Sequence, residues 1–334
     1  MIGHDCRGNF RKLLQNPRFN RGLSLPGHDV GLCFGQRAAA MEIVLHIGAH
    51  RTATTSFQAY MRANAPALAQ AGVAFWGPLR TRNGLFSGLW GPVQPSPKAG
   101  VARVAGRVAL ALARVENSGA RVLVISDENI LGQPCALLRD GRAYPHAVAR
   151  AGALQRAFGG RIGAVVLGVR SPDTWWPSLV AMTAGRGHPM PDAQAWARMA
   201  AGSLDWAALA QALHRAMGCP VGLLAHELCA NAPDQRLAAM LSMRPNAGAA
   251  AAALPSPQMG LHLNAAPPYP GFAPTQAAQL RSAYQAMLQH FAGVAGPVTL
   301  LNKTMPGAQG KTPAPGPIPR GQTHEHQGPV AQTG

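Results

Sequence analysis

The chain has 334 residues, 47% of them hydrophobic, and its 30 Lys and Arg against 13 Asp and Glu give a formal net charge of +17. This apolar content is enough to build a sizeable core and excludes a wholly disordered chain. Only four basic residues are lysines and no run of five or more basic residues occurs, so nucleic acid is not singled out as a partner. An arginine-rich composition and a functional basic site both remain as explanations of the charge.

The cysteines and the apolar runs indicate the class of protein. The five cysteines are scattered, without a C-x-x-C pair and without the Cys and His spacing of a zinc site. No stretch reaches roughly 18 uncharged apolar residues, and residues 1–40 lack the apolar centre of a secretory signal. We therefore expect a cytoplasmic protein with reduced thiols, no metal and no membrane span.

Composition divides the chain into three parts. Residues 1–40 show no helical or strand period, and we expect a disordered or extraneous N-terminal extension, with Met41 as the true or an alternative start. Residues 41–302 hold 21 basic and ten acidic side chains, a net +11, and are predicted to form one α/β domain. Residues 303–334 are rich in Pro, Gly and Gln and are predicted to be a disordered tail, in which His324 and His326 have no expected role.

Strands and helices are predicted to alternate along the domain. Short apolar runs without polar alternation predict strands buried on both faces, at 42–47, 121–126, 162–169 and 220–225, and a weaker one at 297–301. Helices are predicted over about 54–71, 101–117, 146–158, 174–185, 203–217, 232–243 and 274–292, and the alanine-rich stretch 246–257 reads as a loop or linker. The order predicts an α/β fold with a doubly wound parallel sheet and helices on both faces.

The turn after the first strand is the most informative segment. It runs from Gly48 to Ser56 and is made of small and hydroxylated residues, an arrangement that directs backbone N–H groups and a helix N-terminus at one point and binds phosphate or sulfate. Arg51 adds a cation, and Thr52, Thr54 and Thr55 add hydroxyl donors. It is not a Walker A loop, because Ala53 and Thr54 stand where that motif has its second glycine and its lysine. The alternative is a capped helix that binds nothing.

This segment resembles the 5′-phosphosulfate loop of the sulfotransferases, in particular of bacterial members of the family. The resemblance implies a cofactor, 3′-phosphoadenosine 5′-phosphosulfate (PAPS), held by a loop that follows the first strand. The residues that it assigns to cofactor binding here are Gly48, Ala49, His50, Arg51, Thr52, Ala53, Thr54 and Thr55. Arg51 replaces the usual lysine, and Ala53 replaces a glycine, where alanine predicts a negative φ.

Two further matches follow in the family's order. Arg170 ends the 162–169 strand and Ser178 follows eight residues later, and the resemblance implies that they hold the 3′-phosphate of the cofactor. The stretch from Ala225 to Leu228 resembles a structural element of the family, in which we expect Glu227 to cap a helix or brace a loop rather than to catalyse.

The strand at 121–126 is followed by candidates for the catalytic base. Because ligands of open parallel sheets bind at the carboxyl ends of the strands, Glu128 is the first choice, and Asp127 and His50 are alternatives to it. A loop contact without a catalytic role also remains open. Arg51 is expected to stabilise the charge of the departing phosphate.

Two loops are weaker candidates for the same site. Arg80, Arg82 and Asn83 either line the acceptor site or are solvated loop residues. His262 and Asn264 lie late in the chain, where the family closes over the adenosine phosphate.

The resemblance covers about residues 42–243 and implies transfer of a sulfuryl group from PAPS to a hydroxyl or amine of a carbohydrate or small molecule. It requires no metal. A nucleotide-dependent kinase-like P-loop enzyme and a catalytically silent anion-binding module are the alternatives.

Overall fold

The computed structural model of the protein describes residues 40–90, 98–201, 204–245, 254–256 and 271–301. The predictions for residues 1–39, for most of 246–257, for His262 and Asn264, and for 303–334 with His324 and His326 lie outside the described residues.

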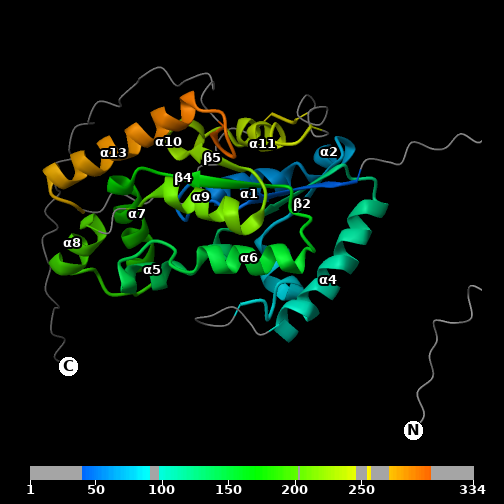
Figure 1. The fold of residues 1–334 in the computed structure, drawn as a ribbon, viewed down its shortest axis with the longest axis horizontal. Coiled ribbons are helices and arrows are strands. Elements are labelled where there is room, and N and C mark those ends of the chain that lie inside the picture. Colours follow the sequence, from blue (N-terminus) through cyan, green and yellow to red (C-terminus); the bar gives the residue numbers. More distant parts are fainter. Residues whose placement is uncertain (1–39, 91–97, 202–203, 246–253, 257–270, 302–334) are drawn as a thin grey trace, which may run out of the picture. The chain divides into compact units, whose positions relative to one another are not determined.

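A six-stranded sheet, parallel throughout, forms the centre of the domain (Figure 1). Its strand order is β2-β3-β1-β4-β5-β6, so β1 lies between β3 and β4. The strands are β1 (Glu42–His46), β2 (Val73–Trp76), β3 (Val122–Ser126), β4 (Ala164–Val169), β5 (Val221–Ala225) and β6 (Val298–Leu300). The α/β class and the parallel sheet are confirmed.

Burial explains why the inner strands were predictable. Every residue of β1, β3, β4 and β5 is buried, as their continuous apolar runs indicate. The strand that the sequence did not predict is β2, a four-residue strand at the edge of the sheet that follows Gly72.

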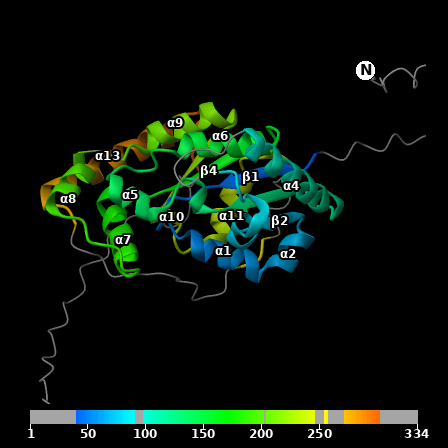
Figure 2. The ribbon, with the colours of Figure 1, turned by 90° about the horizontal axis from the view of Figure 1, so that it is seen from below.

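Apolar side chains from the two faces of the sheet pack into two clusters. Val44, Val124 and Val166 pack with α1, α2 and α11, whereas Leu45, Ile125 and Leu167 pack with α4, α6, α9 and α13. Figure 2 shows the first group of helices below the sheet and α6 and α9 above it. The bounds are α1 (Thr54–Ala63), α2 (Ala65–Gln70), α4 (Lys98–Asn117), α6 (Ala147–Ala157), α9 (Trp206–Met217), α11 (Pro233–Leu241) and α13 (Pro274–Gly293).

Further helices lie around the carboxyl ends of the strands. They are α3 (Pro78–Arg80), the π-helix η2 (Thr81–Leu85), the 3-10 helix η3 (Glu128–Ile130), α5 (Pro134–Asp140), α7 (Pro172–Ala184), α8 (Ala193–Ala201) and α10 (His226–Cys229). The helix predicted over 54–71 is two helices, because the chain leaves helical geometry at Asn64 and starts α2 with Pro66 in its first turn.

The parallel sheet brings one end of every strand to the same edge. Ile47, Asp127, Arg170 and His226 each follow directly on a strand, and they therefore reach this edge from β1, β3, β4 and β5. In the described part of the chain, no helix combines the length and the apolar character needed to cross a membrane.

Candidate functional site

The loop between β1 and α1 passes over the end of β4. The backbone N–H groups of Ile47 and Ala49 donate to the carbonyls of Val166 and Gly168, both at 2.9 Å. A Cβ on Gly48 would lie 2.6 Å from Thr54 Oγ1, and a Cβ on Gly168 would lie 3.2 Å from the Cα of Gly48. Glycine at both positions is thus what lets the loop approach the strand.

Two residues of the loop other than glycine have left-handed backbone geometry. Arg51 has φ 65° and Ala53, which precedes α1, has φ 60°. The prediction of a negative φ at Ala53 is therefore wrong. The carbonyl of Ala53 accepts the N–H of Phe57 at 3.1 Å, so this conformation starts α1 in the direction that the loop requires.

The predicted loop residues differ in what they face. His50, Arg51, Ala53, Thr54 and Thr55 line a cavity of about 490 Å³. Gly48, Ala49 and Thr52 are not among its described lining residues, and the Thr52 hydroxyl donates to the carbonyl of Ala49 at 2.6 Å. Thr52 is thus placed as a brace inside the loop, and its hydroxyl does not point to the cavity as a donor.

Arg51, Arg170 and Ser178 meet in the same cavity although they are far apart in sequence. Arg51 Nε donates to Ser178 Oγ at 2.9 Å, and Arg170 Nη1 donates to the carbonyl of Arg51 at 3.2 Å. Burial, followed by the charges of Arg170 and Arg186, lowers the pKa of Arg51. Burial also lowers the pKa of Arg170. The guanidinium groups are therefore close enough to repel one another, and an anion between them would reduce this repulsion.

His50 is held by protein groups on both sides of its ring. Nδ1 lies 2.8 Å from the Tyr144 hydroxyl and Nε2 lies 3.1 Å from Asn129 Oδ1. Because Asn129 Oδ1 can only accept, Nε2 of the neutral ring carries the proton, and Nδ1 accepts from the Tyr144 hydroxyl, which in turn accepts the His50 backbone N–H at 2.9 Å. Burial lowers the pKa of His50 and outweighs the opposing effects of Asn129 and Glu128. Neutral His50 thus fixes the loop to Tyr144 and to η3.

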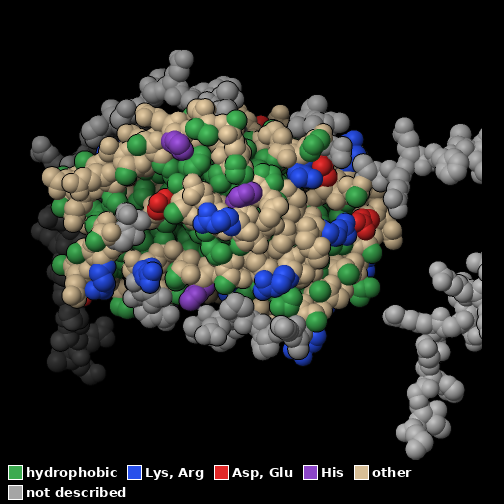
Figure 3. Space-filling view, viewed as in Figure 1, with side chains coloured by type: hydrophobic (Ala, Val, Ile, Leu, Met, Phe, Trp, Pro, Cys, Tyr) green, Lys and Arg blue, Asp and Glu red, His purple; other side chains and the backbone are tan. Residues whose placement is uncertain are grey.

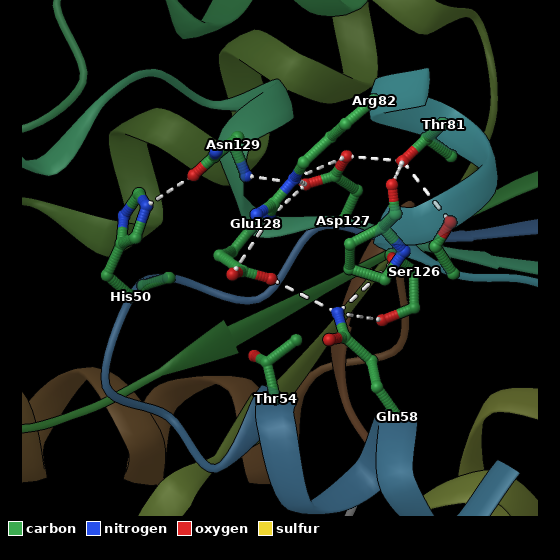
Figure 4. Close-up of polar contacts among 12 residues, drawn as sticks. His50, Thr54, Gln58, Thr81, Arg82, Ser126, Asp127, Glu128 and Asn129 are labelled. Atoms are coloured by element: carbon green, nitrogen blue, oxygen red, sulfur yellow. Dashed lines mark hydrogen bonds and ion pairs between the residues drawn. The ribbon is translucent and has the colours of Figure 1, made fainter. Parts of the chain in front are cut away.

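Glu128 and Asp127 form a carboxylate pair fixed by Arg82 (Figure 4). Arg82 Nη2 lies 2.7 Å from Asp127 Oδ1 and 3.0 Å from Glu128 Oε1. Gln58 Nε2 of α1 donates to Glu128 Oε2 at 3.1 Å, and Glu128 lines the cavity while Asp127 is buried. Burial would lower the pKa of Arg82, but the two carboxylates outweigh it and raise that pKa.

The neighbours of this pair include residues that the sequence did not indicate. Thr81 Oγ1 donates to Asp127 Oδ2 at 2.5 Å, and Gln58 also donates to the Ser126 carbonyl at 3.2 Å. Of the loop predicted near the acceptor, Arg82 reaches the cavity, whereas Arg80 packs over the Trp76 ring at 4.9 Å. Asn83 is exposed.

Glu227 joins three elements. Its carboxylate accepts the backbone N–H of Ser171 at 2.9 Å and the hydroxyl of Tyr284 in α13 at 2.8 Å. The arrangement is that of a loop brace, as predicted, and it fixes the chain after β4 where Arg170 lies.

The charge of the cavity is mainly positive. Its described lining includes Arg51, Arg82, Arg170 and Arg186, but Glu128 as its one carboxylate. His226 lines it too, and its buried Nδ1 has no hydrogen-bond partner in the described residues. Burial, followed by the charges of Arg170 and Arg236, lowers the pKa of His226 to about 3. The cavity is thus suited to an anion, and His226 contributes a neutral ring.

Within the described ranges, no group of three or more His, Cys, Asp and Glu side chains is arranged to hold a metal ion. Cys135 and Cys219 are free thiols there, and burial raises the pKa of Cys219 to about 11.

Comparison of the chain with protein-family models, with curated proteins and with solved structures gave no match.

Proposed function

We propose that the protein is a sulfotransferase that transfers a sulfuryl group from PAPS to a hydroxyl or amine, with the segment 48–55 as the phosphate-binding loop of a doubly wound sheet. The observation that carries the proposal is the contact of Arg51 with Ser178 and Arg170 in one cavity. A motif match alone does not require these residues, 127 and 119 positions apart, to meet.

The residues present fit a donor with two anionic groups. A cavity of about 490 Å³ is in the range of ligand pockets, roughly 300–1,000 Å³. Arg51, Arg170 and Arg186 in its lining supply positive charge for two phosphates, whereas Arg82 is already ion-paired with Asp127 and Glu128.

The roles follow from position. Arg51, Thr54, Thr55 and the start of α1 bind the 5′-phosphate and stabilise its growing charge as the sulfuryl group leaves. Arg170 and Ser178 bind the 3′-phosphate, and the Ser178 hydroxyl, which accepts from Arg51, still has its own proton to donate. Bound PAPS supplies the activated sulfuryl group. Glu128, oriented by Gln58 and Arg82, accepts the proton of the acceptor.

Binding of adenosine 3′,5′-bisphosphate tests the donor site. We expect calorimetry to detect binding of the bisphosphate. R170M should weaken this binding about tenfold to a hundredfold, because a charge-assisted contact is lost. The same variant should leave the affinity for adenosine 5′-phosphate, which lacks the 3′-phosphate, nearly unchanged. R114M, at an exposed arginine of α4, is the control for the lost charge. Binding of ATP without binding of the bisphosphate would instead support a kinase-like enzyme and refute the proposal.

Catalysis is tested with radiolabelled PAPS and a panel of phenols, alcohols and glycans. E128Q keeps the shape of the side chain but removes the proton acceptor, so transfer should fall at least about a hundredfold while bisphosphate affinity stays nearly intact. Unchanged turnover would remove Glu128 as the base. Binding of the bisphosphate without transfer to any acceptor would support a silent anion-binding module.

A further inference from the structure

A second cavity adjoins the one that holds Arg51 and Glu128. Its volume is about 440 Å³, and its lining combines the apolar side chains of Leu138, Pro189, Met190, Pro191 and Ala195 with the polar or charged ones of Cys135, His188, Asp192 and Arg198. These come from α5, from the segment after α7 and from α8, three elements that gather at the same end of the domain in both ribbon views (Figure 1 and Figure 2).

The two cavities share a wall. Cys135 and His188 line both of them, and Cys135 Sγ lies 3.0 Å from His188 Nε2. Cys135 and His188 therefore mark the boundary between the second cavity and the one that Glu128 lines.

The lining of the second cavity favours one kind of occupant. Met190 is 39% exposed there, one of few large apolar side chains in the described residues with so much surface in water. An apolar ligand would cover this surface. A sugar would find hydrogen-bond partners in Asp192 and Arg198 but would place its other hydroxyls against proline, leucine and methionine, where they lose their hydrogen bonds to water.

We infer that the acceptor is an alcohol, phenol or amine with an alkyl or aryl body, which lies in the second cavity and presents its nucleophile to Glu128. The inference rests on the proposed sulfotransferase function. The acceptor oxygen or nitrogen forms a bond to sulfur, and the bond from sulfur to the bridging phosphate oxygen breaks. Its electron pair leaves with adenosine 3′,5′-bisphosphate, and the acceptor's proton passes to Glu128.

The first test is transfer to phenol, 4-butylphenol and maltose. Each buried methylene should lower KM about fourfold, so 4-butylphenol should be bound at least tenfold better than phenol, and maltose should be a poor acceptor. M190D should remove the advantage of the butyl chain over phenol. L110D is the control, because Leu110 is exposed at 68% on α4. Equal use of phenol and 4-butylphenol, or preference for maltose, would overturn the inference.

The second test needs no turnover. Labelling of Cys135 by a thiol reagent, followed on the Cys135 peptide by mass spectrometry, should be slowed by 4-butylphenol in the wild type and in L110D but not in M190D. An unchanged labelling rate in the wild type would overturn the inference whatever the transfer assay gives. Failure of the bisphosphate to bind in calorimetry refutes the donor site instead, so the two failures are distinguishable.

Discussion

Left-handed backbone at Arg51 and Ala53 is the main local strain in the phosphate-binding loop that we propose. For residues with a Cβ this conformation costs about 1–2 kcal/mol each. It is kept because neighbours fix the loop at several points: Gly168 accepts from Ala49, Tyr144 accepts from His50, and the carbonyl of Arg51 accepts from Arg170. The strain at Ala53 is therefore open to removal by substitution.

Glycine at position 53 should stabilise the protein. A53G removes the Cβ from left-handed geometry, and we expect the free energy of unfolding to rise by about 1 kcal/mol in urea titrations. A113G is the matched control, since Ala113 is exposed inside α4 and its replacement should destabilise by roughly 0.5–1 kcal/mol. Loss of stability in both variants would contradict the strain at Ala53.

At single residues, the sequence predicted the parts of the site that follow strands. Arg170 and Ser178 were predicted from the resemblance to the sulfotransferases and Glu128 from its place after a strand, and all three line the cavity. The partners of Glu128 were not found. Gln58 and Arg82 are 70 and 46 residues away from Glu128 in the sequence. No local sequence pattern predicts a contact between side chains so far apart in the chain.

At the level of elements, the loop depends on the close approach of β1 and β4. Gly48 and Gly168 lie face to face with no room for a Cβ, and Ala49 extends the hydrogen bonds of the sheet beyond its last paired residues. The spacing of the two strands thus decides where Arg51 and Thr54 lie.

Alanine at position 168 should displace the loop. Its Cβ would lie 2.9 Å from Thr52 Oγ1 and 3.2 Å from the Cα of Gly48, so G168A should weaken bisphosphate binding at least about tenfold and destabilise the fold by roughly 1–3 kcal/mol. G106A, on the exposed side of α4 with nothing within 4 Å, should instead stabilise by up to about 1 kcal/mol. Wild-type affinity in G168A would show that the loop does not depend on this approach.

Prediction of elements succeeded where burial left a strong pattern. Long helices and strands buried on both faces follow from apolar runs, and their bounds differ from the structure by only a few residues at most ends. β2, α5 and α8 were missed because they are short and bury few side chains, so their apolar residues do not form a long periodic pattern. The second cavity lies between two of these missed elements, so it was not predictable either.

At the scale of the whole molecule, the arrangement of basic side chains differs between the face shown in Figure 3 and the cavity. On the face shown in Figure 3, Lys and Arg side chains are spread among apolar and polar ones rather than gathered into one patch. In the cavity, by contrast, Arg51, Arg170 and Arg186 are close enough to affect one another. The cluster of arginines in the cavity favours binding of a small anion there.

Buried histidines should make the fold sensitive to acid. Burial lowers the pKa of His46, His50 and His226, the last to about 3. A histidine in the unfolded chain has a pKa of about 6.5, so below that pH the unfolded chain binds protons that the folded protein excludes. The free energy of unfolding should therefore fall as the pH decreases from about 6.5 toward 3, by up to about 1.4 kcal/mol per pH unit for each excluded proton.

Urea titrations at pH 7, 6 and 5 measure this dependence. H226Q should lower the slope of the free energy of unfolding against pH, by an amount that corresponds to up to one proton. H146Q, at an exposed histidine, should leave this slope unchanged. Parallel pH profiles for H226Q and the wild type would contradict the exclusion of a proton from His226.

The strand order also determines when the site can form during synthesis. β1 and β2 are made first but do not pair with each other, since both have β3 as a neighbour, and β1 has β4 on its other side. On the ribosome neither strand has a partner until residue 126 has emerged. The loop cannot complete its hydrogen bonds until Gly168 is made, about halfway along the chain. β1, whose side chains are all buried in the finished fold, is therefore the strand that the nascent chain leaves unprotected for longest.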